Sequence, residues 1–92
     1  MAKFIAVHPV GKEMDKEAAT PFAKALKANH TIDAYWICSW YLPEEGKLYC
    51  EFDAKDIESI KKNLEKAEKE SMELPVEGIY KIDMKINSED YR

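Results

Sequence analysis

Residues 34–52 read Ala-Tyr-Trp-Ile-Cys-Ser-Trp-Tyr-Leu-Pro-Glu-Glu-Gly-Lys-Leu-Tyr-Cys-Glu-Phe. Two runs rich in aromatic and β-branched residues flank a short polar turn, which is typical of a β-hairpin. Pro43 cannot donate to a strand ladder and Gly46 tolerates a positive φ, so the chain should reverse between them. The first arm is apolar on both sides of its pleat, which predicts that something covers the second side as well.

N-terminal to the hairpin, the pattern predicts a strand and a helix. Residues 3–7 are strand-like, and Pro9 should stop further pairing. Thr20 followed by Pro21 fits a helix N-cap and first helical residue, so we expect the main helix over residues 21–28 after a looser turn. One kinked helix starting at residue 13 is the alternative.

C-terminal to the hairpin, residues 54–70 form the clearest helix of the chain. Asp56 stands just before an apolar stripe that consists of Ile57, Ile60, Leu64 and Ala67. Residues 76–86 then alternate charged side chains with apolar ones, which predicts a half-buried last strand. Its apolar members are Tyr80, Ile82, Met84 and Ile86. The tail from about residue 87 is polar and should fray.

The element order strand, helix, strand, strand, helix, strand predicts one α+β domain over residues 1–92. The expected architecture is the ferredoxin-like βαββαβ fold, in which a four-stranded antiparallel sheet carries two helices on one face. A net charge of −4 argues against a nucleic-acid partner, because phosphate binding needs a basic surface. No apolar run is long enough to span a membrane and no signal peptide is recognisable, so we expect a cytoplasmic protein in which Cys38 and Cys50 are free thiols.

Two helices can cover one face of such a sheet, and the other face is where function is expected. In the third strand, Leu48, Cys50 and Phe52 should point toward the helices. In the first strand we assign Ile5 and Val7 to the helix side.

The second strand is apolar on both sides of its pleat, so its assignment is weaker. We place Ile37, Ser39 and Tyr41 toward the helices, and a bulge or a one-residue slip would exchange the two sets. On this assignment the uncovered face carries the aromatic residues Phe4, Trp36, Trp40 and Tyr49 around His8, Cys38 and Glu51.

An aromatic patch of this size is larger than a monomer usually exposes. It predicts a homodimer packed through the uncovered face or a pocket filled by a ligand, with Trp36, Trp40 and Tyr49 lining the cofactor or ligand site.

His8, Cys38 and Glu51 would place an imidazole, a thiol and a carboxylate on adjacent strands. Such donors suit divalent transition metals, including zinc, nickel and copper. No C-x-x-C, H-x-x-x-H or H-E-x-x-H motif accompanies them, so their spacing alone does not indicate a metal. Two other hypotheses remain open: His8 as the general base of an enzyme with a small organic substrate, and an aromatic face that docks a partner protein.

Three blocks of the chain resemble a known family of small ferredoxin-like proteins of the dimeric α+β-barrel type, described as nickel-binding or of unknown function. The blocks are Lys3-Phe4-Ile5-Ala6-Val7-His8, Trp36-Ile37-Cys38-Ser39-Trp40 and Gly46-Lys47-Leu48-Tyr49-Cys50-Glu51-Phe52. The resemblance implies a homodimer that binds nickel or another divalent transition metal through His8, with Cys50 as an alternative ligand. The family often has a second histidine where this chain has Pro9, so further ligands would come from Cys38, Glu51 or the other subunit.

Overall fold

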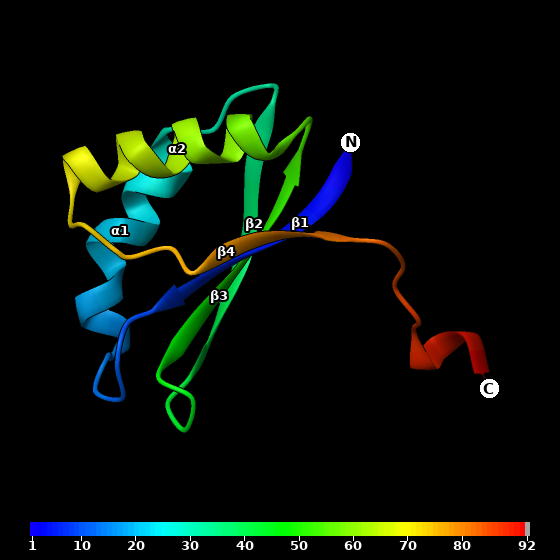
Figure 1. The fold of residues 1–92 in the computed structure, drawn as a ribbon, viewed down its shortest axis with the longest axis horizontal. Helices are drawn as coiled ribbons and strands as arrows, with labels where there is room; N and C mark the ends of the chain where they lie inside the picture. Colours follow the sequence, from blue (N-terminus) through cyan, green and yellow to red (C-terminus); the bar gives the residue numbers. More distant parts are fainter. Residues whose placement is uncertain (92) are drawn as a thin grey trace.

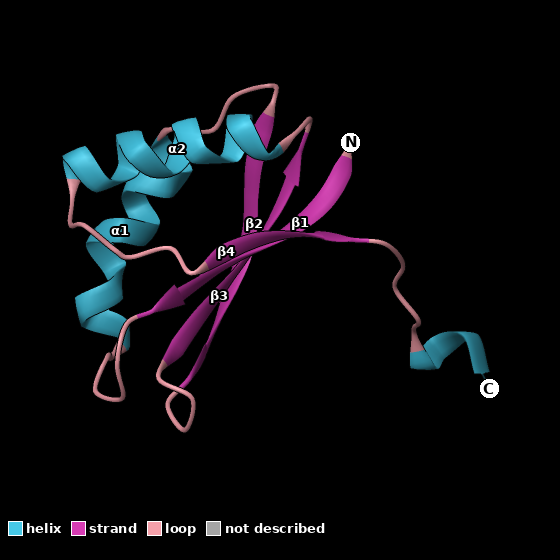
Figure 2. Ribbon diagram, viewed as in Figure 1, coloured by secondary structure: helices cyan, strands magenta, loops and turns pink. Residues whose placement is uncertain are grey.

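The computed structural model describes residues 1–91. Its elements are strand β1 (Ala2–Pro9), helix α1 (Lys16–Ala28), strands β2 (Ala34–Leu42) and β3 (Lys47–Ala54), helix α2 (Ile57–Glu70), strand β4 (Gly78–Ile82) and a short 3₁₀ helix η1 (Ser88–Tyr91). The strands form one antiparallel sheet in the order β2-β3-β1-β4. Both helices lie on the same side of this sheet (Figures 1 and 2). The predicted ferredoxin-like α+β fold is therefore confirmed.

The hairpin turn has the predicted position and is fastened to a second loop. Gly46 has a φ of 68°, and its N–H donates to the carbonyl oxygen of Leu42 at 2.9 Å. The Gly46 carbonyl oxygen accepts from the N–H groups of Val10 and Gly11 at 3.0 and 2.9 Å. The β2–β3 turn and the loop after β1 therefore hold each other in place.

Helix α1 begins at Lys16, so the prediction of a start at Pro21 is wrong and the alternative of one longer helix is closer. Asp15 is the N-cap, and its side chain accepts from the N–H of Ala18 at 2.7 Å. Pro21 lies inside the helix, where it removes one backbone hydrogen bond near the N-terminal end. Burial of the stripe that follows it outweighs this cost; the buried residues are Phe22, Ala25 and Leu26.

Helix α2 begins at Ile57, three residues after the predicted start at residue 54, and ends at Glu70 as predicted. The Asp56 side chain accepts from the N–H of Ser59 at 2.8 Å, which caps the helix. Asn63 on the buried side of α2 donates from its amide to the carbonyl oxygen of Asn29 at 2.7 Å. Because Asn29 is the C-cap of α1, this bond ties the two helices together.

Strand β4 ends at Ile82, so the prediction of a strand through residue 86 is wrong beyond that point. The ladder between β1 and β4 ends at the pair Lys3–Ile82, although β1 itself begins at Ala2. Every residue of the segment 83–91 is exposed. We call this segment the C-terminal arm; Figure 1 shows it leaving the sheet on the side away from the helices.

The first strand presents to the helices the side opposite to the one predicted. Phe4, Ala6 and His8 lie opposite Phe52, Cys50 and Leu48 of β3, and all six are buried. The expectation for β3 is thus confirmed, whereas Ile5 and Val7 point to the uncovered side. β1 is apolar at both parities, and its register with β3 settles which set faces the helices.

A bulge in β2 makes the predicted side-chain directions wrong before it and right after it. The register shifts between Trp36 and Cys38, so that Trp36 lies opposite the buried Phe52 while Cys38 lies opposite Glu51. The placement of Trp36 on the uncovered side is therefore wrong. Beyond the bulge, Cys38 and Trp40 do face that side, and Ser39 and Tyr41 face the helices, as predicted; Ile37 occupies the bulge and is 39% exposed.

No helix in residues 1–91 has the length and apolar character that a membrane crossing requires.

Candidate functional site

We call the side of the sheet away from the helices the open face. Two of its aromatic residues are substantially exposed, Trp40 at 51% and Tyr80 at 56%, whereas Tyr35, which is 45% exposed, packs its ring against His30 with 4.0 Å between ring centroids. Besides Tyr35, the strand register places on this face Lys3, Ile5, Val7, Pro9, Cys38, Trp40, Leu42, Lys47, Tyr49, Glu51, Asp53, Tyr80 and Ile82. The sequence gives no signal that places Tyr35 or Tyr80 on this face, because Tyr35 has the parity opposite to Trp36 and Tyr80 belongs to an apolar stripe that alternation predicts to be buried.

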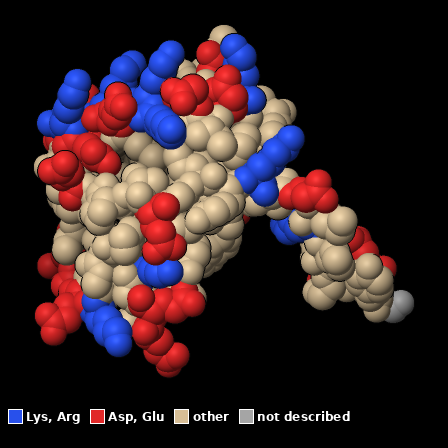
Figure 3. All heavy atoms as spheres, viewed as in Figure 1, with Lys and Arg blue, Asp and Glu red and all other residues tan. Residues whose placement is uncertain are grey.

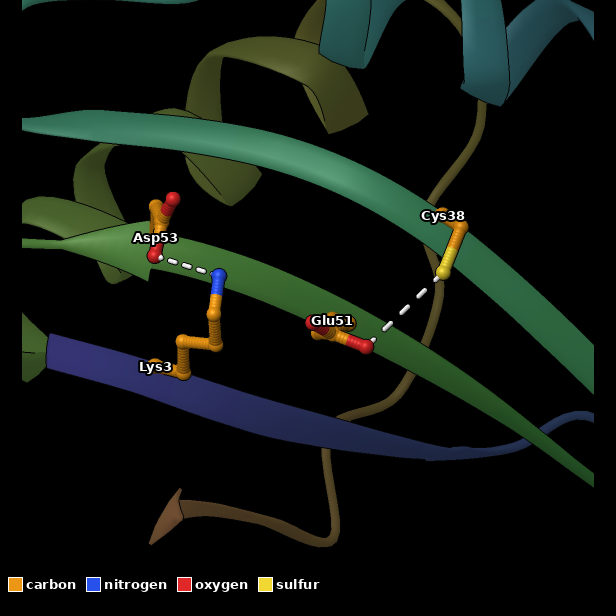
Figure 4. Close-up of polar contacts among 4 residues, drawn as sticks. All are labelled: Lys3, Cys38, Glu51 and Asp53. Carbon is orange, nitrogen blue, oxygen red and sulfur yellow. Dashed lines mark hydrogen bonds and ion pairs between the residues drawn. The ribbon is translucent and has the colours of Figure 1, made fainter. Parts of the chain in front are cut away.

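The β2 bulge brings a thiol next to a carboxylate on the open face. The Cys38 Sγ–H donates to Glu51 Oε1 across 3.9 Å, and Cys38 is half-buried (Figure 4). Burial raises the pKa of the Cys38 thiol, and the adjacent Glu51 carboxylate raises this pKa further by its charge and by accepting the hydrogen bond. At neutral pH the pair therefore holds a proton on sulfur.

A second polar pair lies on the same face and is already neutralised. Lys3 Nζ is 3.0 Å from Asp53 Oδ1, so the Asp53 carboxylate has a cation beside it (Figure 4). Among residues 1–91, Glu51 makes no such ion pair. Glu51 is thus the open-face carboxylate whose charge remains available to a cation.

His8 belongs to the helix side and is fully buried. Its Nδ1 lies 3.1 Å from the carbonyl oxygen of Pro75; a carbonyl can only accept, so Nδ1 carries the proton. The Nε2 atom is buried and has no hydrogen-bond partner among residues 1–91, and the ring packs edge-on against Phe22 at 5.9 Å between centroids. Burial lowers the pKa of His8, and the bond to Pro75 opposes this only in part. His8 therefore joins β1 to the segment that precedes β4, as a neutral side chain.

The structure does not bring the three predicted ligands together. Cys38 and Glu51 are adjacent on the open face, but His8 lies on the other side of the sheet, so the prediction that all three share one face is wrong. For the same reason His8 cannot act as a general base on an open-face substrate. In residues 1–91 there is no group of three or more histidine, cysteine, aspartate or glutamate side chains placed to hold a metal ion.

Two other predicted site residues, Cys50 and Trp36, also lie on the helix side. Both cysteines are free, and burial raises the pKa of Cys50 to about 11. The Ser39 hydroxyl donates to Cys50 Sγ at 3.0 Å and accepts from the Trp36 indole N–H at 2.9 Å. Trp36 and Cys50 thus belong to one partly buried chain of hydrogen bonds. Of the predicted aromatic site, Trp40 and Tyr49 remain on the open face, where they lie opposite each other.

Comparison with known proteins gives one family and one solved structure. A family model described as "Nickel responsive protein SCO4226-like" matches residues 4–82. The crystal structure of SCO4226 from Streptomyces coelicolor A3(2) is similar, with a TM-score of 0.67 and 17% sequence identity over 92% of this chain and 100% of that chain. A likeness at this identity shows the fold alone. A search of curated proteins finds no match.

Proposed function

Because this chain belongs to the SCO4226-like family of nickel-responsive proteins, we propose that two copies of it hold a divalent transition metal between their open faces. Nickel is the expected ion on account of the family. Cys38 and Glu51 of each copy supply the donor atoms.

The observation that carries this proposal is the thiol–carboxylate pair, with 3.9 Å between Cys38 Sγ and Glu51 Oε1. Sulfur and oxygen donors both bind first-row transition metals, although this set does not by itself distinguish nickel from zinc or copper. One chain offers two donors, about half of a common four-ligand shell. A two-fold axis through the open face would bring a second pair from the other copy.

The exposed aromatic residues support pairing through the same face. The helices cover one side of the sheet, and Trp40 and Tyr80 are each about half exposed on the other. An apolar patch of this kind on a small domain marks an interaction surface. Dimerisation would bury these rings and would also exclude water from the metal donors.

A nickel titration tests the donor set. We expect Glu51→Gln and Cys38→Ser each to weaken nickel binding at least about tenfold in isothermal titration calorimetry, because each removes one of two donors per chain. Binding should weaken as the pH falls, since the raised pKa of the Cys38 thiol means that the ion must displace a proton.

Asp53→Asn is the matched control, because it removes a carboxylate from the same strand and the same face. Its nickel affinity should stay within about threefold of the original chain. Unchanged affinity in both Cys38→Ser and Glu51→Gln would remove these residues from the site, and one nickel ion per chain would contradict a shared site.

Trp40→Glu tests the dimer. Trp40 is 51% exposed on the open face, and a carboxylate in its place would have to be desolvated in a face-to-face dimer. We expect the dimer dissociation constant in sedimentation equilibrium to rise at least about tenfold. Ile32→Glu is the control, because Ile32 is 90% exposed in the loop before β2. Equal dissociation constants for the two variants would place the interface elsewhere.

A further inference from the structure

A small polar cavity lies beside the N-terminal part of α2, within the helix layer. Its volume is about 150 Å³, and it is lined by the loop between α1 and β2 and by one side of α2. Figure 1 shows this loop running past the first turns of α2. The lining residues include Asn29 and Asp33 of the loop and Lys62, Asn63 and Lys66 of α2.

The volume of the cavity limits the size of a ligand. Because a water molecule takes up about 30 Å³ of liquid, the cavity has room for about five waters or for a molecule of a few heavy atoms. Pockets for nucleotide-sized or drug-sized ligands begin at about 300 Å³. The cavity therefore suits a very small molecule.

Asn63 brings an unpaired hydrogen-bond acceptor to this cavity. It is 3% exposed and is the most buried of the lining residues. Its side-chain nitrogen donates to the carbonyl oxygen of Asn29 at 2.7 Å, and a carbonyl can only accept, so this bond fixes which end of the amide is oxygen. The Oδ1 atom is then buried with no partner among residues 1–91. Since buried polar atoms almost always have a partner, a ligand in the cavity should donate to Oδ1.

Side chains of both charges line the cavity without forming ion pairs. Lys62 and Lys66 lie about one helical turn apart on α2, and Asp33 lies on the loop. Within residues 1–91 none of the three has an ion-pair partner, whereas the neighbouring Lys61 is 3.7 Å from Glu58. In Figure 3 basic side chains gather along the upper edge of the molecule, over α2. Like charges one turn apart repel each other, so this pair of lysines favours an anion between them.

The end of α1 favours a cation on the loop side of the cavity. Asn29 is the C-cap of this 13-residue helix, and its carbonyl oxygen is the group that Asn63 contacts. The C-terminal end of a helix carries a partial negative charge, which attracts positive groups. Asp33 adds a full negative charge on the same loop. The negative groups of the cavity therefore belong to the loop and the positive ones to α2.

We propose that this cavity binds a small zwitterionic α-amino acid. The ammonium group donates to Asn63 Oδ1 and pairs with Asp33, and the carboxylate lies between Lys62 and Lys66. A purely anionic ligand would meet Asp33 and Oδ1 with charge of the wrong sign, and a simple amine would leave both lysines unpaired. None of these residues is on the open face, so the proposal is independent of the metal site and of the dimer.

A titration followed by heteronuclear NMR of the labelled full chain tests the proposal. Glycine, L-alanine and L-serine are the probes, because their few heavy atoms suit the volume of the cavity. We expect at least one of them to shift the side-chain amide signals of Asn63 saturably, with a dissociation constant of about 1 mM or below. Acetate and methylammonium each carry one of the two charges, and both should bind at least about tenfold more weakly.

Replacement of exposed charged residues locates the binding without disturbing the core. Lys62→Met, Lys66→Met and Asp33→Asn should each weaken amino-acid binding at least about tenfold, because each removes one charge that the ligand would meet. Lys69→Met is the matched control, since Lys69 is exposed on α2 but does not line the cavity. Its affinity should stay within about twofold of the original chain.

Every other outcome contradicts the proposal. The absence of a saturable shift with all three amino acids would overturn it. Acetate or methylammonium that binds as tightly as the amino acids would overturn it too, because the cavity would then recognise a single charge. Affinities in the three cavity variants that match the affinity of Lys69→Met would place the binding elsewhere. Cys38 and Glu51 take no part, so none of these results changes the expectations for nickel.

Discussion

Replacing Phe52 with alanine is expected to lower the free energy of unfolding by about 3–5 kcal/mol. Phe52 is fully buried in β3, and it lies opposite Phe4 on one side and Trp36 on the other. Loss of its ring would leave a cavity between these neighbours and the helices, which interior packing can fill only in part. Urea denaturation followed by circular dichroism measures the change.

The predicted loss is large for a domain of this size, because such proteins are stable by only about 5–15 kcal/mol. Ile32→Ala is the control: Ile32 is 90% exposed, and its replacement should change stability by no more than about 0.5 kcal/mol. A loss below about 1 kcal/mol for Phe52→Ala would mean that the core does not close around this ring.

The second large effect is expected from acid, through His8. The pKa of His8 in the folded chain lies below its ordinary value of 6.5 because the ring is buried. At a pH between the lowered pKa of His8 in the folded chain and 6.5, the unfolded chain binds a proton at His8 that the folded chain does not. The free energy of unfolding must therefore fall as the pH drops below 6.5, by up to about 1.4 kcal/mol per pH unit.

A His8→Gln variant isolates this contribution. At neutral pH it should be the less stable protein, because it loses the ring packing on Phe22 and alters the bond to Pro75. Below pH 6.5 the difference from the original chain should narrow, since the variant has no proton to take up at this position. Urea denaturation at a series of pH values measures the difference.

His30→Gln serves as the comparison for His8→Gln. Burial and the charge of Lys27 lower the pKa of His30, so His30 also makes the free energy of unfolding fall as the pH drops. Its Nε2 accepts from the Trp36 backbone N–H at 3.0 Å. Because His30 is far less buried than His8, the difference in stability between His30→Gln and the original chain should change less with pH. If the difference in the free energy of unfolding between His8→Gln and the original chain stays constant across the pH range, His8 has the same pKa in the folded and unfolded protein.

Of the candidate site, the sequence predicted some residues and misplaced others. Cys38, Glu51, Trp40 and Tyr49 are on the open face as expected, whereas His8 and Trp36 are not. The bulge at Ile37 is the cause in β2: it leaves Trp36 on one side and moves the parity of every later residue by one. In β1 no such irregularity exists, and both sides of the strand are simply apolar.

Local chemistry is sufficient for the parts of this fold that depend on a few neighbouring residues. The sequence is enough to predict the turn at Pro43 and Gly46, the position of Asp56 just before α2 and the periodicity of α2. Each of these reflects backbone angles or hydrogen bonds within a few residues. The start of α1 is less readable, since burial of Phe22 and Leu26 overrides the local preference of Pro21.

The choice of sheet face and the end of β4 required long-range pairing. Side chains alternate with a period of two, so a strand that is apolar throughout has two equivalent orientations, and the register of β1 and β2 against β3 selects one of them. Likewise, the β1–β4 ladder ends at the pair Lys3–Ile82, although the alternation in the sequence continues. Both results come from partners distant in the chain, and neither is encoded within the strand concerned.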